Sequence, residues 1–267
     1  MATVASGGDD RNVSIGRVFG RGFGTIIGNP LVTLGVAFAF GALPSTLLSY
    51  GIQNFREQSL ELIGPFAAIA IAIVSIVVAV LLGMITQGAL VRATVAYSEG
   101  RKASFGESAM AGLSVVVPLF LVGLLSSLGI ALGFLLLIVP GVILYVMWSV
   151  AAPALVEEKL GPVEALGRSR DLTRGARWKI FGLTLVMIVI YWIFSALIGV
   201  IGMMWYGGLD DFALATERGL PLAYLAFSAI VQTITSAVWG VIQTSLYVEL
   251  RDWKDGPPSE QLAEIFG

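Results

Sequence analysis

The residues of this chain with the clearest potential for chemistry are cations gathered in one short segment. They are Arg168, Arg170, Arg174, Arg177 and Lys179, the densest basic patch of the sequence. A cation close to an anionic membrane surface gains about 1 kcal/mol, so the patch is a candidate site for lipid headgroups. Because cytoplasmic loops of membrane proteins are generally basic, ordinary topology explains the patch equally well, and the sequence leaves both interpretations open.

A row of uncharged polar residues is the second candidate site. It consists of Gln232, Ser236 and Gln243, whose offsets of four, seven and eleven residues place them on one helical stripe. Side chains of this kind usually form hydrogen bonds between helices, worth roughly 0.6 kcal/mol each. The alternative is that the stripe lines a polar cavity, to which Gln87 would also contribute.

Four glycines, Gly16, Gly20, Gly24 and Gly28, recur every four residues near the start of the chain. This spacing allows another helix to approach closely along one face. Each glycine weakens a helix by about 1 kcal/mol relative to alanine, so a helix built this way needs a close partner for its order. We therefore predict a packing groove. Its partner is open: this chain, a second copy in a homo-oligomer, or another membrane protein.

The chain contains no cysteine and no histidine, which excludes disulfides, thiolate or imidazole metal ligands and the usual general base of hydrolases. An intramembrane enzyme would need a carboxylate pair drawn from Glu99, Glu157, Glu158 or Glu249. These residues are spread along expected interfacial segments, where solvated acidic side chains are normal. We therefore expect a non-enzymatic protein without a cofactor or metal. The net charge of −2 gives no sign of a nucleic-acid partner.

Composition determines which elements position these residues. Hydrophobic residues make up 57% of the chain and charged residues 13%, against roughly 45 to 50% and 25% in soluble domains. A bilayer core of about 30 Å requires about 20 apolar residues in a helix. Six uncharged runs meet this length, the third and fourth inferred from one stretch that is too long for a single span. The predicted spans are Pro30–Gly51, Ile63–Leu90, Leu113–Leu132, Pro140–Val156, Ile180–Trp205 and Pro221–Val248.

The distribution of positive charge predicts the orientation. With loops assigned alternately to the two sides, fourteen of the sixteen lysines and arginines fall on one side, and Arg56 and Arg218 fall on the other. The positive-inside rule then places both termini in the cytoplasm. We expect residues 1–29 to form a cytoplasmic tail and interfacial helix, 30–250 a six-span membrane domain, and 251–267 a cytoplasmic tail.

Each cytoplasmic segment that precedes a pair of spans has the signals of a short amphipathic helix on the membrane surface. Two begin with capping serines, and the third begins with a Gly-Pro pair and ends at a glycine. Within the third, Glu164 and Arg168 have the i, i+4 spacing of an ion pair. The predicted fold is an all-α polytopic membrane protein with six transmembrane helices and three cytoplasmic interfacial helices. The signal residues are Ser14, Ser104 with Glu107, and Gly161, Pro162 and Gly175.

Three prolines, Pro44, Pro118 and Pro153, interrupt predicted spans and are expected to kink them. Kinks can open a cavity between helices, and mid-span aromatic side chains could line it. Ordinary bundle packing is the alternative. The aromatic residues are Tyr145, Trp148, Tyr191, Trp192 and Trp239.

The segment from Ile138 to Gly182 carries a dense and distinctive pattern. Its elements are Pro140-Gly141, Trp148-Ser149, Pro153, Glu157-Glu158, Gly161-Pro162, Ala165, Arg168-Ser169, Leu172-Thr173, Gly175 and Trp178. In this pattern the chain resembles the membrane domain found ahead of the catalytic barrel in some membrane-bound glycerophosphodiester phosphodiesterases, and its free-standing relatives. The resemblance implies a multi-span bacterial inner-membrane protein. It implies no catalytic residue, because the chemistry of those fusions resides in the soluble barrel.

Two functions follow from the sequence. The first is a non-enzymatic accessory or organising subunit of the inner membrane that binds membrane lipids or a partner membrane protein. The alternative is a transporter or lipid-handling protein with a cavity between the proline-kinked spans. The predicted span cores carry no ionisable residue, which argues against coupling to protons or ions.

Overall fold

In a computed structural model, residues 13–218 and 220–256 are described, with the backbone alone for 52–65, 67–68 and 216–218. This part of the chain is helical and contains no strand. The elements are α1 Ile15–Gly28, α2 Pro30–Val36, a π-helix η1 Ala37–Ala42, α3 Leu43–Ser98, α4 Phe105–Ser114, α5 Val116–Leu136, α6 Ile138–Met147, α7 Ala151–Glu158, α8 Pro162–Thr173, α9 Arg177–Tyr206, α10 Leu209–Arg218 and α11 Leu222–Asp255.

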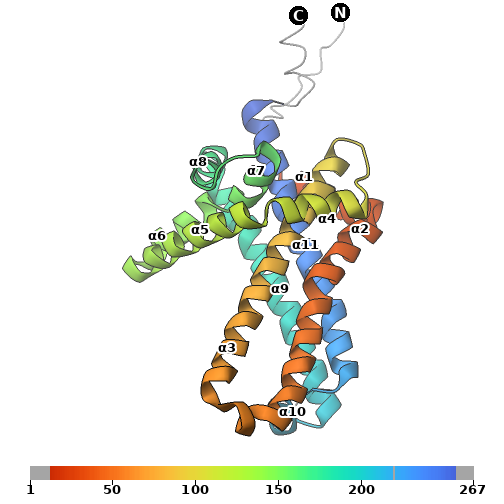
Figure 1. Ribbon diagram of the computed structural model, residues 1–267. Helices are drawn as coiled ribbons and strands as arrows, with labels where there is room; N and C mark the ends of the chain where they lie inside the picture. The colour runs from red at the N-terminus through yellow and green to blue at the C-terminus, as the bar shows by residue number, and fades with distance from the viewer. Residues whose placement is uncertain (1–12, 219, 257–267) are drawn as a thin grey trace, which may run out of the picture.

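The long helices form an upright bundle (Figure 1). α3 descends from η1, turns back at the lower end of the bundle and ascends again, so that this one helical element supplies two arms. α9 and α11 run beside these arms. The short helices α1, α2, α4, α7 and α8 gather at the upper end, and α10 lies at the lower end.

Six helical segments are long and apolar enough to cross a membrane, and they lie where the sequence predicts spans. Their bounds are Pro30–Gly51, Ile69–Ser98, Val116–Leu136, Ile138–Glu158, Arg177–Tyr206 and Leu222–Asp255. The turn between the third and fourth segments is reduced to Leu137, whose extended backbone separates α5 from α6. α11 continues unbroken past residue 250, so no break within the described residues marks the expected start of the tail. The rest of the expected tail, residues 257–267, lies outside the described residues.

The three predicted short helices are present as α1, α4 and α8. Ser14 Oγ accepts a hydrogen bond from Arg17 N at 3.5 Å, and Ser104 Oγ accepts one from Glu107 N at 3.1 Å. α8 begins after Gly161, whose N–H donates to Glu164 Oε2 at 2.9 Å. These bonds satisfy N–H groups that a helix start leaves unpaired.

The expected ion pair between Glu164 and Arg168 is not formed. Glu164 turns back to cap its own helix, and Arg168 instead reaches Glu158 and Asp255. Arg168 therefore pairs with carboxylates from other parts of the fold and not with Glu164, because an i, i+4 ion pair stabilises a helix by only about 0.2–0.5 kcal/mol.

Each predicted proline kink is a helix interruption placed just before the proline. Pro118 and Pro153 are the third residues of α5 and α7, where a missing backbone N–H costs nothing because the first turn has no acceptor for it. The helical structure is interrupted before these prolines, at Val115 and at Trp148–Val150. Pro44 follows the π-helix η1, a wider turn that interrupts the regular hydrogen-bond pattern.

The upper end of α11 fastens the short helices to the bundle. Glu249, only 4% exposed, accepts hydrogen bonds from Ser14 N at 3.0 Å and from Arg17 Nε at 2.9 Å, which holds α1. Tyr247 donates its hydroxyl to Glu158 Oε1 at 2.9 Å, which holds α7. Arg168 bridges Glu158 and Asp255 and holds α8. The salt bridges among the described residues lie at this end.

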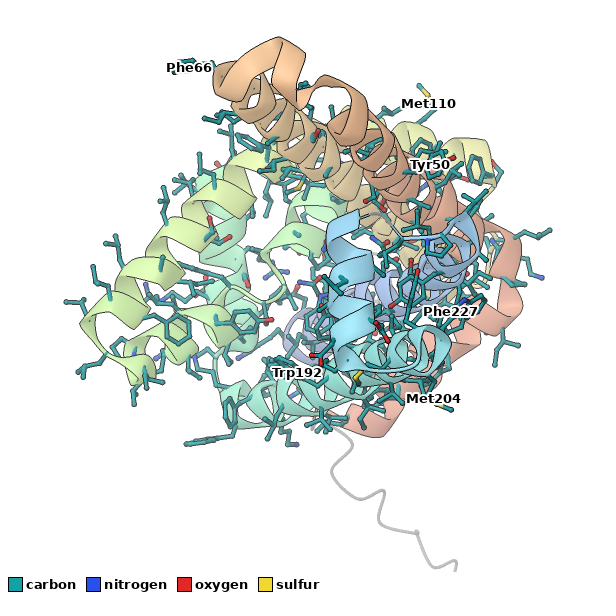
Figure 2. All side chains as sticks on the ribbon, turned by 90° about the horizontal axis from the view of Figure 1, so that it is seen from below. Tyr50, Phe66, Met110, Trp192, Met204 and Phe227 are labelled. Carbon is teal, nitrogen blue, oxygen red and sulfur yellow. The ribbon has the colours of Figure 1, made fainter. Side chains whose placement is uncertain are left out.

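The α5–α6 hairpin departs from the bundle. Figure 1 shows it leaving the upper end sideways, and Figure 2, seen from below, shows it extending away from the other helices. Its two arms pack on each other, and the side chains at the turn between them are exposed. At the turn, Leu135, Leu137 and Ile138 are 81%, 69% and 73% exposed.

α10 is a helix that was not predicted from the sequence. Its start carries Asp210 and Asp211, and Phe212 packs between Tyr206 and Tyr224 with ring centroids 5.8 and 5.7 Å apart. The spacing of Leu209, Phe212 and Ala213 after two glycines is the signal that could have identified this helix.

Candidate functional site

A cavity of about 710 Å³ opens within the bundle, between the two arms of α3, α9 and α11. Its walls are mainly apolar. Pro44 lies in the wall next to the π-helix, so the irregular turn predicted as a kink contributes to the opening. The volume lies within the roughly 300–1,000 Å³ typical of ligand pockets.

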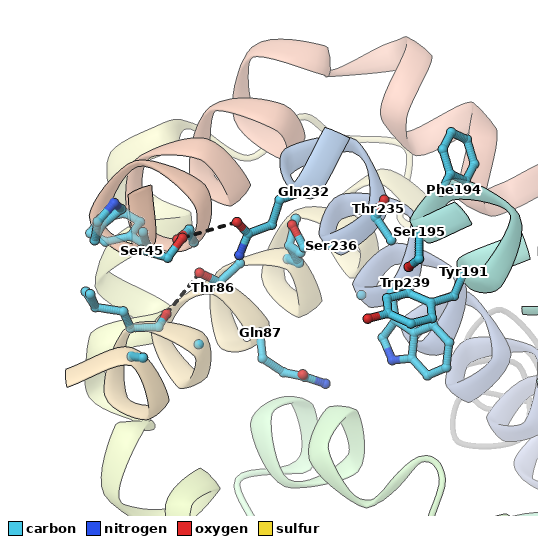
Figure 3. A pocket seen from close by; sticks show the side chains of 18 of the residues that line it. Ser45, Thr86, Gln87, Tyr191, Phe194, Ser195, Gln232, Thr235, Ser236 and Trp239 are labelled. Atoms are coloured by element: carbon cyan, nitrogen blue, oxygen red, sulfur yellow. Dashed lines mark hydrogen bonds between the residues drawn. The ribbon is translucent and has the colours of Figure 1, made fainter. Parts of the chain in front are cut away.

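Polar side chains face this cavity from two sides (Figure 3). Ser45, Thr86 and Gln232 gather on one side, and Tyr191, Ser195 and Trp239 gather on the other. Ser45 Oγ donates to Gln232 Oε1 at 3.2 Å. The side chain of Gln232 is thereby held at the cavity wall, with its amide nitrogen left to donate.

Several of these polar groups have no hydrogen-bond partner among the described residues. They are the amide nitrogen of Gln232, the hydroxyls of Tyr191 and Ser195, and the indole N–H of Trp239. These groups are accessible from the cavity and can each form a hydrogen bond with an occupant. The cavity is therefore suited to an occupant that is largely apolar and carries hydrogen-bond acceptors.

A second cavity of about 250 Å³ lies at the root of the α5–α6 hairpin, bordered also by α9 and α11. Gln87 and Trp239 line both cavities. Gln87 Nε2 donates to Gln243 Oε1 at 2.8 Å, and Gln243 Nε2 donates to the Ser149 carbonyl at 2.6 Å. This chain of hydrogen bonds therefore begins at a residue that both cavities share and continues along the wall of the smaller one.

The structure divides the predicted polar stripe between two roles. Gln232 and Ser236 line the larger cavity, and Ser236 Oγ also donates to the Thr233 carbonyl at 3.1 Å within its own helix. Gln243 lines the smaller cavity and joins α11 to α3 and to the end of α6. Both interpretations of the stripe therefore apply to the two glutamines: each lines a cavity and each forms a hydrogen bond to another helix, Gln232 with Ser45 and Gln243 with Gln87.

The predicted headgroup patch does not act as one unit. Arg168 is held by Glu158, with Nε 2.8 Å from Oε2, and by Asp255. Burial opposes its charge, but its hydrogen bonds to Asp255 and Glu158 outweigh that effect and raise the pKa of Arg168 above its ordinary value. Lys179 Nζ donates to the Val13 carbonyl at 3.0 Å. These two cations stabilise the fold.

The remaining three cations differ. Arg170 and Arg174 are exposed and have no ion pair with any described residue, and the exposed Trp178 follows close by in the chain. Arg177 Nε is buried and has no hydrogen-bond partner in the described part of the chain. Of the five cations, only Arg170 and Arg174 are thus both exposed and without an ion pair or a side-chain hydrogen bond within the described residues.

The glycine row is partly occupied by this chain itself. A Cβ added at Gly24 or Gly28 would lie 3.0 or 2.5 Å from atoms of the Tyr97 ring, so α1 packs against the upper end of α3 through these two positions. At Gly20 nothing lies within 4 Å, and at Gly16 the nearest atom is Ser14 Oγ at 3.8 Å. The predicted groove is therefore an intramolecular contact over half its length.

The four carboxylates considered for an intramembrane enzyme are mostly paired. Glu249 binds Arg17, Glu158 binds Arg168, and Glu99 accepts from Arg101 Nε at 3.0 Å. Nearby, the hydrogen bond from Arg101 lowers the pKa of Glu107. The contacts of Glu249 and Glu158 connect one helix to another, whereas Glu99 and Arg101 belong to the same loop.

Residues 113–264 match the family described as the membrane domain of glycerophosphoryl diester phosphodiesterase. The match covers more than half of the chain, from the end of α4 through α11. This protein belongs to that family. The resemblance seen in the sequence is thereby confirmed, and it extends well beyond the dense segment that first indicated it. Comparisons with curated proteins and with solved structures gave no match.

Membership of this family, together with six apolar helices, identifies an integral membrane protein with several candidate spans. The name of the family refers to an enzyme, but the matched part is its membrane domain. The family therefore supports the membrane architecture of this chain. The candidate functional site is the larger cavity.

Proposed function

We propose that this protein is a non-enzymatic lipid-binding protein of a bacterial inner membrane, which holds a lipid tail in the cavity between the α3 arms, α9 and α11. The observation that carries this proposal is the apolar cavity of about 710 Å³ with unpaired hydrogen-bond donors in its wall.

The donors favour a particular class of occupant. Lipid tails are as apolar as leucine, so a tail gains little merely by leaving the bilayer for an apolar cavity. Preference must come from polar contacts. The amide nitrogen of Gln232, the Ser195 hydroxyl and the Trp239 indole N–H can all donate to carbonyl oxygens. An ester-linked lipid, which carries such carbonyls beside its tails, fits this arrangement.

In this proposal the end of the molecule with α1, α4 and α8 faces the cytoplasm. The support is the count of fourteen cations against two and the presence of both described chain ends at that end of the bundle. Interfacial positions for α1, α4 and α8 follow, with their apolar faces turned toward the bilayer.

The geometry favours holding a lipid over carrying it across the membrane. The larger and the smaller cavity share Gln87 and Trp239 in their walls, and Gln87 is fixed there by its hydrogen bond to Gln243. An accessory subunit that retains or presents a lipid needs one opening, whereas a transporter needs a path to both sides. We therefore prefer the accessory role.

A cavity-filling substitution tests the proposal. Gly83 lines the cavity, and a Cβ added there meets nothing within 4 Å, so Gly83→Phe would place its ring in open space. Gly182→Phe on α9 is the matched control, because Gly182 is equally unobstructed and lies outside the cavity. The readout is native mass spectrometry after gentle extraction from membranes of a bacterial phospholipid mixture.

We expect the unsubstituted protein and the control variant Gly182→Phe to retain an ester-linked lipid, and Gly83→Phe to retain at least tenfold less. Equal retention by all three proteins, or no retained lipid in any of them, would refute the proposal.

A further inference from the structure

The upper end of the molecule, where α1, α4, α7 and α8 gather and the salt bridges of the described residues lie, is called the charged end below. We infer that the α5–α6 hairpin does not cross the bilayer, and that its tip ends among the acyl chains of the leaflet adjoining the charged end. The hairpin is then inserted in one leaflet only, and lipid acyl chains contact its exposed apolar side chains. The inference is independent of what occupies the larger cavity.

The chemistry of the tip is the first observation. No polar side chain occurs from Leu128 to Leu144, a stretch that contains both sides of the turn at Leu137. The two turns at the lower end of the bundle are different. Between the two candidate spans that α3 contributes to, the sequence carries Arg56 and Glu57, and between those of α9 and α11 it carries Asp210 and Asp211. A turn that emerged into water would be expected to carry polar residues in the same way.

The direction of the hairpin is the second observation. α5 has 21 residues, about 31 Å of helix, which would suffice to cross a bilayer if it stood upright. It instead leaves the bundle sideways in both views, whereas α9 and α11 run along the bundle axis (Figures 1 and 2). The same length therefore gives less depth along that axis.

The backbone of the turn is the third observation. Leu137 N donates to the Gly133 carbonyl at 3.0 Å, and the Leu137 carbonyl accepts from Gly141 N at 3.5 Å. Pro140 has no N–H that needs a partner. These two bonds pair both backbone groups of Leu137, the one residue outside the two helices, in the way that hydrocarbon favours.

The arms also close on each other without polar contacts. A Cβ added at Gly133 would lie 2.9 Å from Gly141 Cα, so the two backbones touch where the arms meet. The hairpin is therefore held together by close packing of small residues, which needs no contact with the rest of the protein.

Both roots of the hairpin lie at the charged end. α4 precedes α5, and α7 and α8 follow α6, and all three gather at the upper end of the bundle. A hairpin that returns to the side from which it started leaves the sidedness of the termini unchanged. The positive charge count is also unchanged, because the hairpin carries no lysine or arginine.

Single-cysteine labelling tests the inference, because the chain has no cysteine of its own. Leu137→Cys reports on the tip. Gly208→Cys reports on the lower end and Gly106→Cys on the charged end, and a Cβ added at either glycine meets nothing within 4 Å. The probe is a membrane-impermeant maleimide, added to intact vesicles of each orientation. Leu136→Cys and Ile138→Cys repeat the tip measurement should Leu137→Cys fail to fold.

We expect Gly208→Cys to be labelled from one side, Gly106→Cys from the other, and the tip cysteines at least tenfold more slowly from either side than in denatured protein. Labelling of the tip from the side of Gly208 would show that the hairpin crosses. Labelling from the side of Gly106 would show that it lies in water. Either result overturns the inference.

A second readout distinguishes lipid from protein around the tip. A bimane fluorophore on the tip cysteine should be quenched by phospholipids brominated at mid-chain. Absence of quenching would mean that protein, such as a second copy, covers the tip, and would also overturn the inference.

Discussion

α11 of the upright bundle and α5 of the hairpin differ in packing although both are apolar. α5 is more apolar, and 17% of its most apolar stretch is buried against 44% for α11, whereas α9 and the second arm of α3 are buried to only 11%. The face of α11 toward the bundle carries small and hydroxyl residues such as Ala237, Gly240 and Thr244, and Leu90 packs against Gly240. Apolar composition therefore determines the solvent of a helix, while small residues and polar bonds determine whether it packs on other helices.

The largest effect is expected where backbones touch in the packed part of the molecule. A Cβ at Gly112 of α4 would collide with the Ile85 carbonyl of α3, so Gly112→Val must push the two helices apart. We expect a loss of about 1–3 kcal/mol in the free energy of unfolding, measured by thermal unfolding in mild detergent. Gly106→Val, in the same helix with no atom within 4 Å, is the control. Equal loss in both variants would contradict the packing described.

A smaller effect is expected at the upper end of α11. Arg17→Ala removes the closest cation from the buried Glu249 carboxylate, which then keeps Ser14 N at 3.0 Å and Arg21 at 3.8 Å. Hydrogen bonds to charged groups are worth about 1.5–3 kcal/mol, and the half-exposed position of Arg17 favours the lower end of this range.

The control for Arg17→Ala is Arg170→Ala, because Arg170 is exposed and makes no ion pair with a described residue. We expect it to change the free energy of unfolding by less than about 0.5 kcal/mol. Chemical unfolding of the two variants should separate them clearly. If both behaved alike, Glu249 would not fasten α1 to the bundle.

The hydrogen bonds between the bundle and the hairpin are expected to contribute less to the free energy of unfolding than the contacts of Glu249. Gln243→Leu removes the hydrogen bonds to Gln87 and to the Ser149 carbonyl near the hairpin root. Buried hydrogen bonds in membrane proteins average about 0.6 kcal/mol, with a maximum of about 1.7. A double-mutant cycle with Gln87→Leu should give less than additive losses, and fully additive losses would show that the two side chains do not interact.

The smallest effect is expected at the hairpin tip. Leu135 is 81% exposed, so Leu135→Ala removes little packing within the described protein. We expect a change of less than about 0.5 kcal/mol in the free energy of unfolding in detergent. A loss of the roughly 2–5 kcal/mol typical of a buried leucine would mean that the tip packs on protein, and the contrast with the bundle would disappear.

Much of the fold follows directly from sequence, because length, hydropathy and capping residues act locally. The six candidate spans and the starts of α1, α4 and α8 are of this kind. The partners of polar side chains are not local. Arg168 reaches Asp255, far along the chain, and Gln243 reaches Ser149, so the basic patch and the polar stripe each divide in a way that spacing cannot reveal.

The direction in which the hairpin leaves the bundle could also not be predicted from the sequence. Two uncharged runs of adequate length predict two spans, since hydropathy reports affinity for hydrocarbon but not the angle of a helix within it. The absence of polar residues at the turn around Leu137 was a usable signal. Its meaning became clear only with the sideways direction of α5 and α6.

The most direct test of this contrast is a depth profile of nitroxide labels along α5 and along α9 in a bilayer, from the relative accessibility to oxygen and to a water-soluble nickel chelate. For α9 we expect depth to rise toward the middle of the helix and to fall again toward Tyr206. For α5 we expect depth to rise toward Leu136 without falling. A profile along α5 that returns to headgroup depth at Leu136 would contradict the account.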